Sequence, residues 1–213
     1  MNVEIYTFNA FQENTIIAIC ESSKDCIVFD PGCSNDSERK MLTDAIQNHG
    51  WRPVKLINTH CHIDHVLGNK YISEKFSLDL EAHEGEVPVL QSCEQVSKMY
   101  GIAYEGSPDI RKYIAAGDKI QFGEVSLDVV FTPGHSPASL CFIDRESKQV
   151  IGGDVLFHGS IGRTDLPGGN YNTLIDSIKT QLMTLPDDFT VYPGHGPATT
   201  IGFERANNPF LQG

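Results

Sequence analysis

Residues 60–65 concentrate side chains that can bind a metal ion, with three histidines, one cysteine and one aspartate in six positions. These candidate ligands are His60, Cys61, His62, Asp64 and His65. They follow an apolar run, residues 54–58, that we expect to form a buried strand. Three imidazoles and a carboxylate this close together would be costly to bury without a cation that binds them. The cluster therefore favours a metal site over a group of structural histidines.

The spacing inside the cluster separates the candidates. His60 and His62 are two positions apart, so their side chains point the same way along an extended segment. Cys61 alternates with them and should face the opposite side, so we expect it not to be a ligand. Asp64 and His65 follow on the next turn of the chain. The spacing predicts two neighbouring pairs of ligands, and Cys61 belongs to neither.

Three further candidate ligands lie far along the chain, each where an apolar, strand-like run gives way to glycine or proline. They are His135 in TPGHSPAS, Asp154 in GGDVLF and His195 in VYPGHGP. Loops at strand ends share one rim of a sheet core, where side chains from distant sequence can converge, and the neighbouring glycines allow sharp turns. Five imidazoles and two carboxylates are too many for one tetrahedral zinc and about right for two metals with a bridging carboxylate and a bridging water.

The remaining histidines stand alone in the sequence. They are His49, His83 and His158. An isolated histidine is more often a surface or core residue than a metal ligand, so we expect structural roles for all three.

Two blocks of strands and helices must position the candidate ligands. The first is predicted to have strands at residues 3–8, 15–20, 26–29 and 54–58, and helices at 37–48, 69–75 and 84–100. The second is predicted to have strands at residues 119–122, 125–131, 139–144, 149–152 and 190–192, and a helix at 171–184. The first three strands are typical of an antiparallel meander. Because each sheet has one face to bury and one to cover, the pattern predicts two sheets packed face to face with helices outside.

Length, composition and charge limit the possible classes of protein. The chain has 213 residues, 40% of them hydrophobic and 21% charged, and no linker-like stretch, so we expect one domain spanning residues 1–213. The formal net charge of -12 repels polyphosphate and anionic membrane surfaces. We therefore expect a small-molecule substrate and neither nucleic acid nor membrane as a partner. The sequence carries no signal of oligomeric state.

The cellular compartment is predicted from the N-terminus and the cysteines. The first residues, MNVEIYTFNAF, lack the basic stretch and apolar core of a signal peptide, and no apolar run reaches membrane-spanning length. The six cysteines are scattered without a CxxC pair. Cys20 and Cys26 flank a predicted hairpin turn, but free thiols are the expected state in a reducing compartment. We expect a cytoplasmic protein.

The string THCHIDH, residues 59–65, resembles the metal-binding signature of the metallo-β-lactamase superfamily. The resemblance continues in order through FDPG at residues 29–32 and through His135, Asp154 and His195. It implies an α+β fold, a four-layer αββα sandwich, which agrees with the two blocks of elements described above.

The resemblance also implies a role for each position. The first metal would be held by His60, His62 and His135. The second would be held by Asp64, His65 and His195, with Asp154 bridging the two metals. Asp30 in the DPG turn would position the metal-binding loop. The implied cofactors are two divalent metal ions. Zinc is the first candidate, and ligands of nitrogen and oxygen type also bind iron or manganese.

Two longer motifs are similar to those of one group within this superfamily. GGDVLFHGSIGRTDLPGGN (residues 152–170) and YPGHGPATTIGFERANNPFL (residues 192–211) are similar to compact glyoxalase II-like hydrolases, also called hydroxyacylglutathione hydrolase-like proteins. Arg163 occupies the place of a basic residue that contacts glutathione in glyoxalase II, whereas Asp165 replaces a tyrosine contact. Arg163 therefore either binds substrate or pairs with Asp165. Only 18 residues follow His195, so the C-terminal helical domain of full-length glyoxalase II is not expected here.

The implied activity is hydrolysis of a thioester such as S-lactoylglutathione or a related acyl-thiol. In this reaction Asp64 would both bind metal and accept a hydrogen bond from the attacking hydroxide. The alternative is a persulfide dioxygenase, which would bind one iron through His60, His135 and Asp154. The motif PGHG with His195 favours the hydrolase, because it supplies a ligand for the second metal. Three other classes fit the sequence less well. A secreted β-lactamase would need an export signal, and an RNA nuclease would need a basic surface. A non-catalytic binding module is disfavoured because all seven ligand positions are filled.

Overall fold

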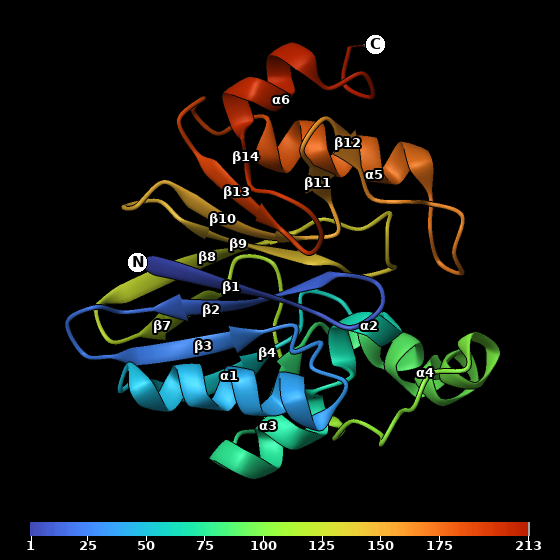
Figure 1. The fold of residues 1–213 in the computed structure, drawn as a ribbon. Helices are drawn as coiled ribbons and strands as arrows, with labels where there is room; N and C mark the ends of the chain where they lie inside the picture. The colour runs from blue at the N-terminus through green and yellow to red at the C-terminus, as the bar shows by residue number, and fades with distance from the viewer. Residues whose placement is uncertain (213) are drawn as a thin grey trace. The chain divides into compact units, whose positions relative to one another are not determined.

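The computed structural model describes residues 1–212, and residue 213, the last residue of the predicted domain, lies outside the described residues. The described residues form two compact units. The first comprises Met1–Ile114 and Gln121–Val125, and the second comprises Ala115–Ile120 and the residues from Ser126 onward. Six strands form one sheet and six form another (Figure 1). The expectation of a single domain stays a prediction.

The first sheet has the strand order β1-β2-β3-β4-β5-β6. Its strands are β1 (Asn2–Phe8), β2 (Glu13–Ile19), β3 (Asp25–Phe29), β4 (Arg52–Ile57), β5 (Leu80–Ala82) and β6 (Ile110–Tyr113). The first three pair antiparallel, which confirms the predicted meander. From β3 to β6 the pairing is parallel, so β3 and β4 end at the same edge of the sheet. Asp30 and the histidine cluster leave the sheet at that edge.

Helices cover one face of the first sheet (Figure 1). They are α1 (Asp36–Asn48), α2 (Ile63–Val66), α3 (Asn69–Phe76), the 3-10 turn η1 (Glu84–Glu86) and α4 (Val87–Tyr100). The side chain of Asn35 caps α1 by accepting a hydrogen bond from the Glu38 N–H. Leu42 and Ile46 of α1 are buried against the sheet in the apolar core of this unit. Pro88 lies in the first turn of α4, as expected.

The second sheet has the strand order β14-β13-β10-β9-β8-β7. Its strands are β7 (Lys119–Phe122), β8 (Val125–Phe131), β9 (Leu140–Asp144), β10 (Gln149–Gly153), β13 (Thr190–Pro193) and β14 (Thr199–Thr200). Strand β9 is antiparallel to both β8 and β10, and β10 is parallel to β13. Strands β8, β10 and β13 therefore run in the same direction, and the loops that carry His135, Asp154 and His195 leave the same edge.

Helices cover one face of the second sheet as well (Figure 1). The helix predicted at residues 171–184 is α5 (Tyr171–Ser177) followed by a π-helical turn, η2 (Ile178–Leu182), and α6 (Ile201–Asn207) comes near the end of the chain. Leu174 and Ile178 pack in one apolar core with Val150 and Val191 of the sheet. A two-stranded hairpin, β11 (Leu156–Phe157) with β12 (Ser160–Ile161), follows Asp154.

Two further expectations concern membrane helices and thiols. Within residues 1–212, no helix combines the length and the apolar character that crossing a bilayer requires. All six cysteines are free and buried, which confirms the expectation of free thiols. Cys20 lies near the end of β2 and Cys26 lies within β3, and no disulfide joins them.

Candidate metal centre

The loop after β4 and the short helix α2 gather the first group of candidate ligands in the first unit. His60 and His65 are fully buried, and their ring centroids are 4.2 Å apart. The ring of His62 lies 4.8 Å from that of His60, so the two histidines predicted to face the same way are neighbours. Asp30, His60 and His65 each offer a ligand atom within 4.8 Å of the others. The segment therefore presents nitrogen and oxygen donors at one place.

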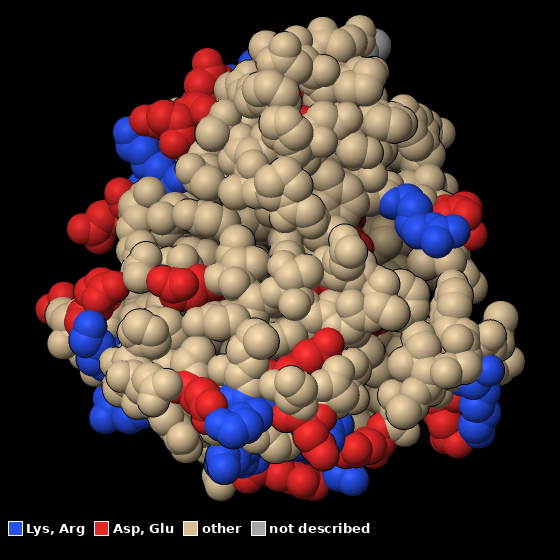
Figure 2. Space-filling model, in the orientation of Figure 1, with Lys and Arg blue, Asp and Glu red and all other residues tan. Residues whose placement is uncertain are grey.

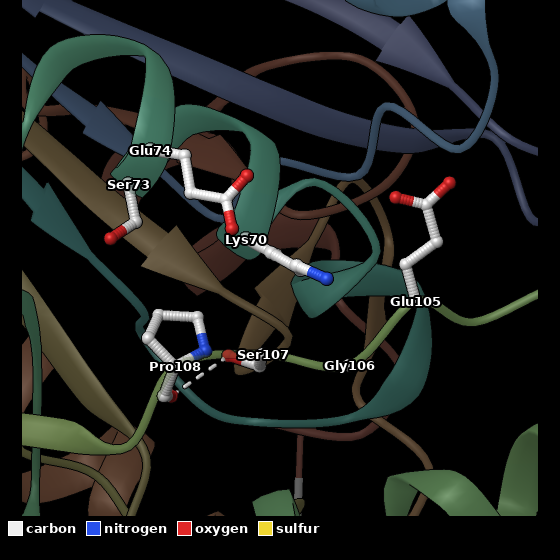
Figure 3. Close-up of a pocket in the computed structure, with 7 residues that line it drawn as sticks. All are labelled: Lys70, Ser73, Glu74, Glu105, Gly106, Ser107 and Pro108. Atoms are coloured by element: carbon white, nitrogen blue, oxygen red, sulfur yellow. Dashed lines mark hydrogen bonds between the residues drawn. The ribbon is translucent and has the colours of Figure 1, made fainter.

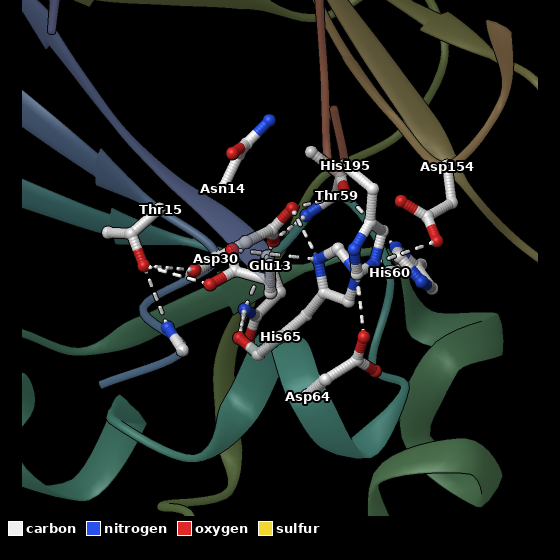
Figure 4. Close-up of polar contacts among 12 residues, drawn as sticks. Glu13, Asn14, Thr15, Asp30, Thr59, His60, Asp64, His65, Asp154 and His195 are labelled. Atoms are coloured by element: carbon white, nitrogen blue, oxygen red, sulfur yellow. Dashed lines mark hydrogen bonds and ion pairs between the residues drawn. The ribbon is translucent and has the colours of Figure 1, made fainter. Parts of the chain in front are cut away.

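Asp30 organises this loop. Its Oδ1 accepts a hydrogen bond from the Thr59 backbone N–H at 2.7 Å, and its Oδ2 accepts one from the Thr59 hydroxyl at 2.6 Å. The same Oδ2 lies 3.2 Å from His65 Nδ1. Figure 4 shows these side chains turned toward one another. Asp30 thus contacts both ends of the loop, and its role toward a bound metal stays a prediction.

In His60 and His65, the ring nitrogen Nδ1 contacts another group of the protein. His60 Nδ1 lies 3.1 Å from the Thr59 hydroxyl, and His65 Nδ1 contacts Asp30. A ring held through Nδ1 presents Nε2 as the metal-binding atom. His65 Nε2 is 3.6 Å from Asp64 Oδ2. Two ligands at 2.0–2.2 Å from a tetrahedral metal lie about 3.4 Å apart, so this separation fits a shared ion.

Cys61 is not part of the ligand group. Its side chain is fully buried in the apolar core of the first unit, as the alternation with its neighbours predicts. Burial raises the pKa of its thiol well above the usual value. Its backbone N–H donates to Glu86 Oε2 at 2.8 Å, and its carbonyl accepts from Cys93 Sγ at 3.3 Å. The sequence pattern does not single out Glu86, because a carboxylate in a first helical turn usually faces solvent.

Glu13 is a second buried carboxylate behind the loop. Its Oε2 accepts a hydrogen bond from the Thr15 hydroxyl at 3.0 Å, and its Oε1 lies 3.9 Å from His65 Nδ1. Burial raises the pKa of Glu13 well above its usual value. A Cβ on Gly32 would lie 1.9 Å from Glu13 Oε2, so only glycine fits beside it. No sequence signal predicts this contact, since Glu13 and His65 are far apart in the chain.

The second unit brings together the other three predicted ligands. Asp154 Oδ2 lies 3.5 Å from His135 Nε2 and 3.5 Å from His195 Nε2 (Figure 4 labels Asp154 and His195). His135 Nδ1 contacts the Arg163 carbonyl oxygen at 2.8 Å, so its Nε2 is the atom presented to a metal. One carboxylate oxygen therefore lies at the same distance from two imidazole nitrogens. Separations of this size fit ligands that share an ion, and the bridging role of Asp154 stays a prediction.

The side chain of Arg163 pairs locally. Its Nε and one terminal nitrogen contact the two oxygens of Asp165 at 2.7 and 2.8 Å, and both side chains are exposed. Hydrogen bonding to Arg163 lowers the pKa of Asp165 to about 2. Of the two alternatives for Arg163, the local pair is present, and the substrate contact stays a prediction. Its backbone carbonyl, which orients His135, is a role that the sequence does not reveal.

The three isolated histidines have structural contacts. His49 stacks on Trp51 with ring centroids 4.5 Å apart, and His158 stacks on Phe203 at 4.4 Å. His83 Nδ1 accepts a hydrogen bond from the Gly85 N–H at the start of η1. These contacts agree with the structural roles expected for all three.

The donor set fits divalent metal ions. The first unit contributes three imidazoles and one carboxylate, and the second contributes two imidazoles and one carboxylate. Ligands of nitrogen and oxygen type suit zinc, iron and manganese. In both units the separations between imidazole nitrogen and carboxylate oxygen match those of ligands that share an ion.

This fold and these ligands define the class of protein. The chain belongs to the metallo-beta-lactamase superfamily, whose family description matches residues 9–195. It is 35% identical over 214 residues to the hydroxyacylglutathione hydrolase GloC of Haemophilus influenzae, and the match covers 99% of this chain and 98% of that protein. The sequence similarity to a hydroxyacylglutathione hydrolase, expected from the motifs, is thus confirmed.

Two solved structures are similar over nearly the whole chain. The BLEG-1 B3 metallo-beta-lactamase has a TM-score of 0.90 with 30% identity, and the match covers 100% of both chains. TTHA1623, solved in a di-iron-bound form, has a TM-score of 0.88 with 34% identity, covering 98% of this chain and 100% of that one. They confirm the predicted α+β fold of the metallo-β-lactamase type.

Proposed function

We propose that this protein is a binuclear metallohydrolase that cleaves a thioester such as S-lactoylglutathione or a related acyl-thiol. The observation that carries the binuclear part is the position of Asp154 Oδ2, which lies 3.5 Å from Nε2 of both His135 and His195. Five imidazoles and two carboxylates are more ligands than a single tetrahedral ion binds, which supports a second ion. The relationship to a hydroxyacylglutathione hydrolase supports the thioester part.

The proposed ligand sets follow the superfamily pattern position by position. One metal is assigned His60, His62 and His135. The other is assigned Asp64, His65 and His195, with Asp154 shared. Zinc is the first candidate, and iron or manganese fit the same donors. The di-iron form of TTHA1623 supports including iron among the candidates.

The residues of the chain divide the work of hydrolysis. Divalent ions held by these residues would supply hydroxide at neutral pH, by lowering the pKa of bound water toward about 7. The Asp64 carboxylate accepts a hydrogen bond from that nucleophile and orients it toward the thioester carbonyl. Asp30 and the Arg163 carbonyl hold His65 and His135 in position. A thiolate is a good leaving group, so the reaction needs little help from a general acid.

The relationship to GloC and the loop after β12 bear on the class of substrate. The match to GloC covers 98% of that protein, which supports glutathione thioester chemistry for the part of the protein described by this sequence. Arg163 is the proposed contact for an anionic group of the thiol. Its guanidinium is exposed beside Asp165, where an anionic group of a substrate could reach it.

The net charge of the chain and its free cysteine thiols support the proposed substrate partner and cellular compartment. On the face shown in Figure 2, Lys and Arg side chains are interspersed with Asp and Glu and form no continuous basic patch. Together with the net charge of -12, this supports a small-molecule substrate over nucleic acid. Six free cysteines support a reducing compartment, the cytoplasm.

The test combines metal analysis of the purified protein with three parallel assays. These measure thioester hydrolysis, β-lactam hydrolysis and oxygen consumption with a persulfide substrate. We expect two metal ions per chain and thioester cleavage. One iron per chain with persulfide-dependent oxygen uptake would replace the proposal with a dioxygenase, and β-lactam turnover without thioester turnover would assign another hydrolase activity.

The variants His60→Ala and Asp154→Ala test the ligand assignment. Each removes a proposed ligand, so we expect bound metal to fall and activity to drop by more than about 100-fold. His49→Ala is the matched control, since His49 contacts Trp51 and is not a proposed ligand. Full hydrolysis by a metal-depleted ligand variant would contradict the proposal.

A further inference from the structure

A chain of buried hydrogen bonds connects the metal-binding loop of the first unit to a loop at the surface of the same unit. Asn58 and Asn69, both fully buried, form the middle of this chain. We propose that the two asparagines are positioning residues that hold His65 in its metal-binding orientation. The inference rests on the proposed metal centre, and it assigns a role to residues outside the ligand set.

Asn58 fixes two parts of the loop with one amide group. Its Nδ2 donates to Asp30 Oδ1 at 3.2 Å and to the His65 backbone carbonyl at 3.0 Å. Asp30 in turn contacts the ring of His65 through Nδ1. Asn58 therefore holds both the backbone of His65 and the carboxylate that orients its ring.

Asn69 sets the direction in which the Asn58 amide faces. The Asp30 carboxylate and the His65 carbonyl accept hydrogen bonds and cannot donate them, so Asn58 must present its NH₂ group to them. Its Oδ1 then faces away and needs a donor. Asn69 Nδ2 supplies that donor at 2.7 Å. If Asn69 is removed, Asn58 Oδ1 is buried without this partner, which removes the preference for this orientation of the amide.

The outer end of the chain lies at the surface. Asn69 Nδ2 also donates to Ser107 Oγ at 3.0 Å, and Ser107 Oγ donates to the Pro108 carbonyl at 3.1 Å. Ser107 lines a pocket of about 280 Å³ together with Lys70 and Glu105, as Figure 3 shows. The hydrogen bonds thus run from this pocket through Asn69 and Asn58 to Asp30.

The expected effect is on metal affinity. Losing a group that orients a metal-binding histidine typically weakens metal binding about 10 to 100-fold. Asn69 acts through Asn58 and Asp30, so we expect Asn69→Ala to weaken binding of the His65 metal about tenfold, at the low end of this range. Asn58→Ala should weaken it at least as much. The double variant should lose little more than Asn58→Ala, because both residues act in one chain.

The experiment measures Zn²⁺ binding to the metal-depleted, folded protein by competition with a chromophoric chelator. Asn208→Ala is the matched control. Asn208 is also fully buried and its Nδ2 also donates two hydrogen bonds, to Ser160 O and to Glu204 Oε2, in the second unit. We expect Asn208→Ala to lower thermal stability while leaving zinc affinity unchanged. Should Asn69→Ala not fold, Asn69→Ser and Ser107→Ala test the same link.

Each outcome decides the proposal. Weaker zinc binding in the Asn58 and Asn69 variants, with zinc excess restoring occupancy, supports positioning. Unchanged affinity in folded Asn69 variants, or an equal loss in Asn208→Ala, overturns it. If the wild-type protein binds two zinc ions and the variants bind them weakly, but no thioester is cleaved, the proposed function fails and the positioning role stands.

Discussion

At the residue scale, the candidate ligand histidines are oriented by different kinds of group. His60 contacts a threonine hydroxyl, His65 a carboxylate and His135 a backbone carbonyl. Ligands must be particular residue types, so they stand out in a sequence. The carbonyl that contacts His135 belongs to Arg163, but any residue at that position has a carbonyl. Such a partner leaves no trace in the sequence, and only the folded backbone reveals it.

The pair between Arg163 and Asp165 leads to a prediction about substrate binding. If Arg163 contacts the anionic thiol portion, Arg163→Ala should raise KM severalfold with little change in kcat, because the residue binds rather than reacts. Asp165→Asn should lower KM, since it releases the guanidinium for the substrate. Steady-state kinetics with a glutathione thioester measures both values. Unchanged KM in both variants would assign Arg163 to the local pair alone.

The pH dependence of this pair has a definite sign. Arg163 lowers the pKa of Asp165 to about 2, so the carboxylate stays charged above that pH and is protonated only as the pH falls through it. The pair therefore persists across the neutral range, and the KM effect of Arg163→Ala should not vary with pH there. An NMR titration of the Asp165 carboxyl should give a higher pKa in Arg163→Ala, nearer the ordinary value of 3.8.

At the element scale, the long elements and two four-residue strands, β7 and β13, were predictable, whereas the shortest elements were not. The meander β1 to β3 and helices α1 and α3 agree with the patterns of apolar residues and helix caps. Strands of two or three residues, such as β5, β11 and β14, are too short for a periodic pattern. The turn η1 before α4 is another short element, and it places Glu86 against the metal-binding loop.

Glu86 supports a prediction about stability. Glu86→Ala leaves the Cys61 backbone N–H buried without its carboxylate acceptor, so the free energy of unfolding should fall by about 2 kcal/mol. Urea unfolding of the metal-depleted protein measures this change. Glu86→Gln keeps one acceptor oxygen and should lose less. Glu94→Ala on the exposed side of α4 is the control and should behave like the wild type. Equal stability of Glu86→Ala and Glu94→Ala would contradict the role given to Glu86.

At the scale of the whole molecule, metal binding should stabilise the folded chain. An ion that binds only the folded state at 100 times its Kd contributes about 2.7 kcal/mol, and for a protein of this size that corresponds to a rise in Tm of about 5–10 °C. Calorimetry of the metal-loaded and chelated proteins measures the difference. Asp154→Ala should show a smaller difference, because it lacks the shared ligand. An identical Tm with and without metal would contradict the metal centre.

By itself, the sequence determined the superfamily, the seven candidate ligands and the exclusion of Cys61, because metal ligation and strand alternation depend on residue type and spacing. Only the tertiary structure revealed Glu13, Glu86, Asn58 and Asn69 behind the ligands. These contacts join segments that are distant in the chain or use groups that every residue carries. Burial then decides their importance, since a carboxylate or amide without water must find its partners within the fold.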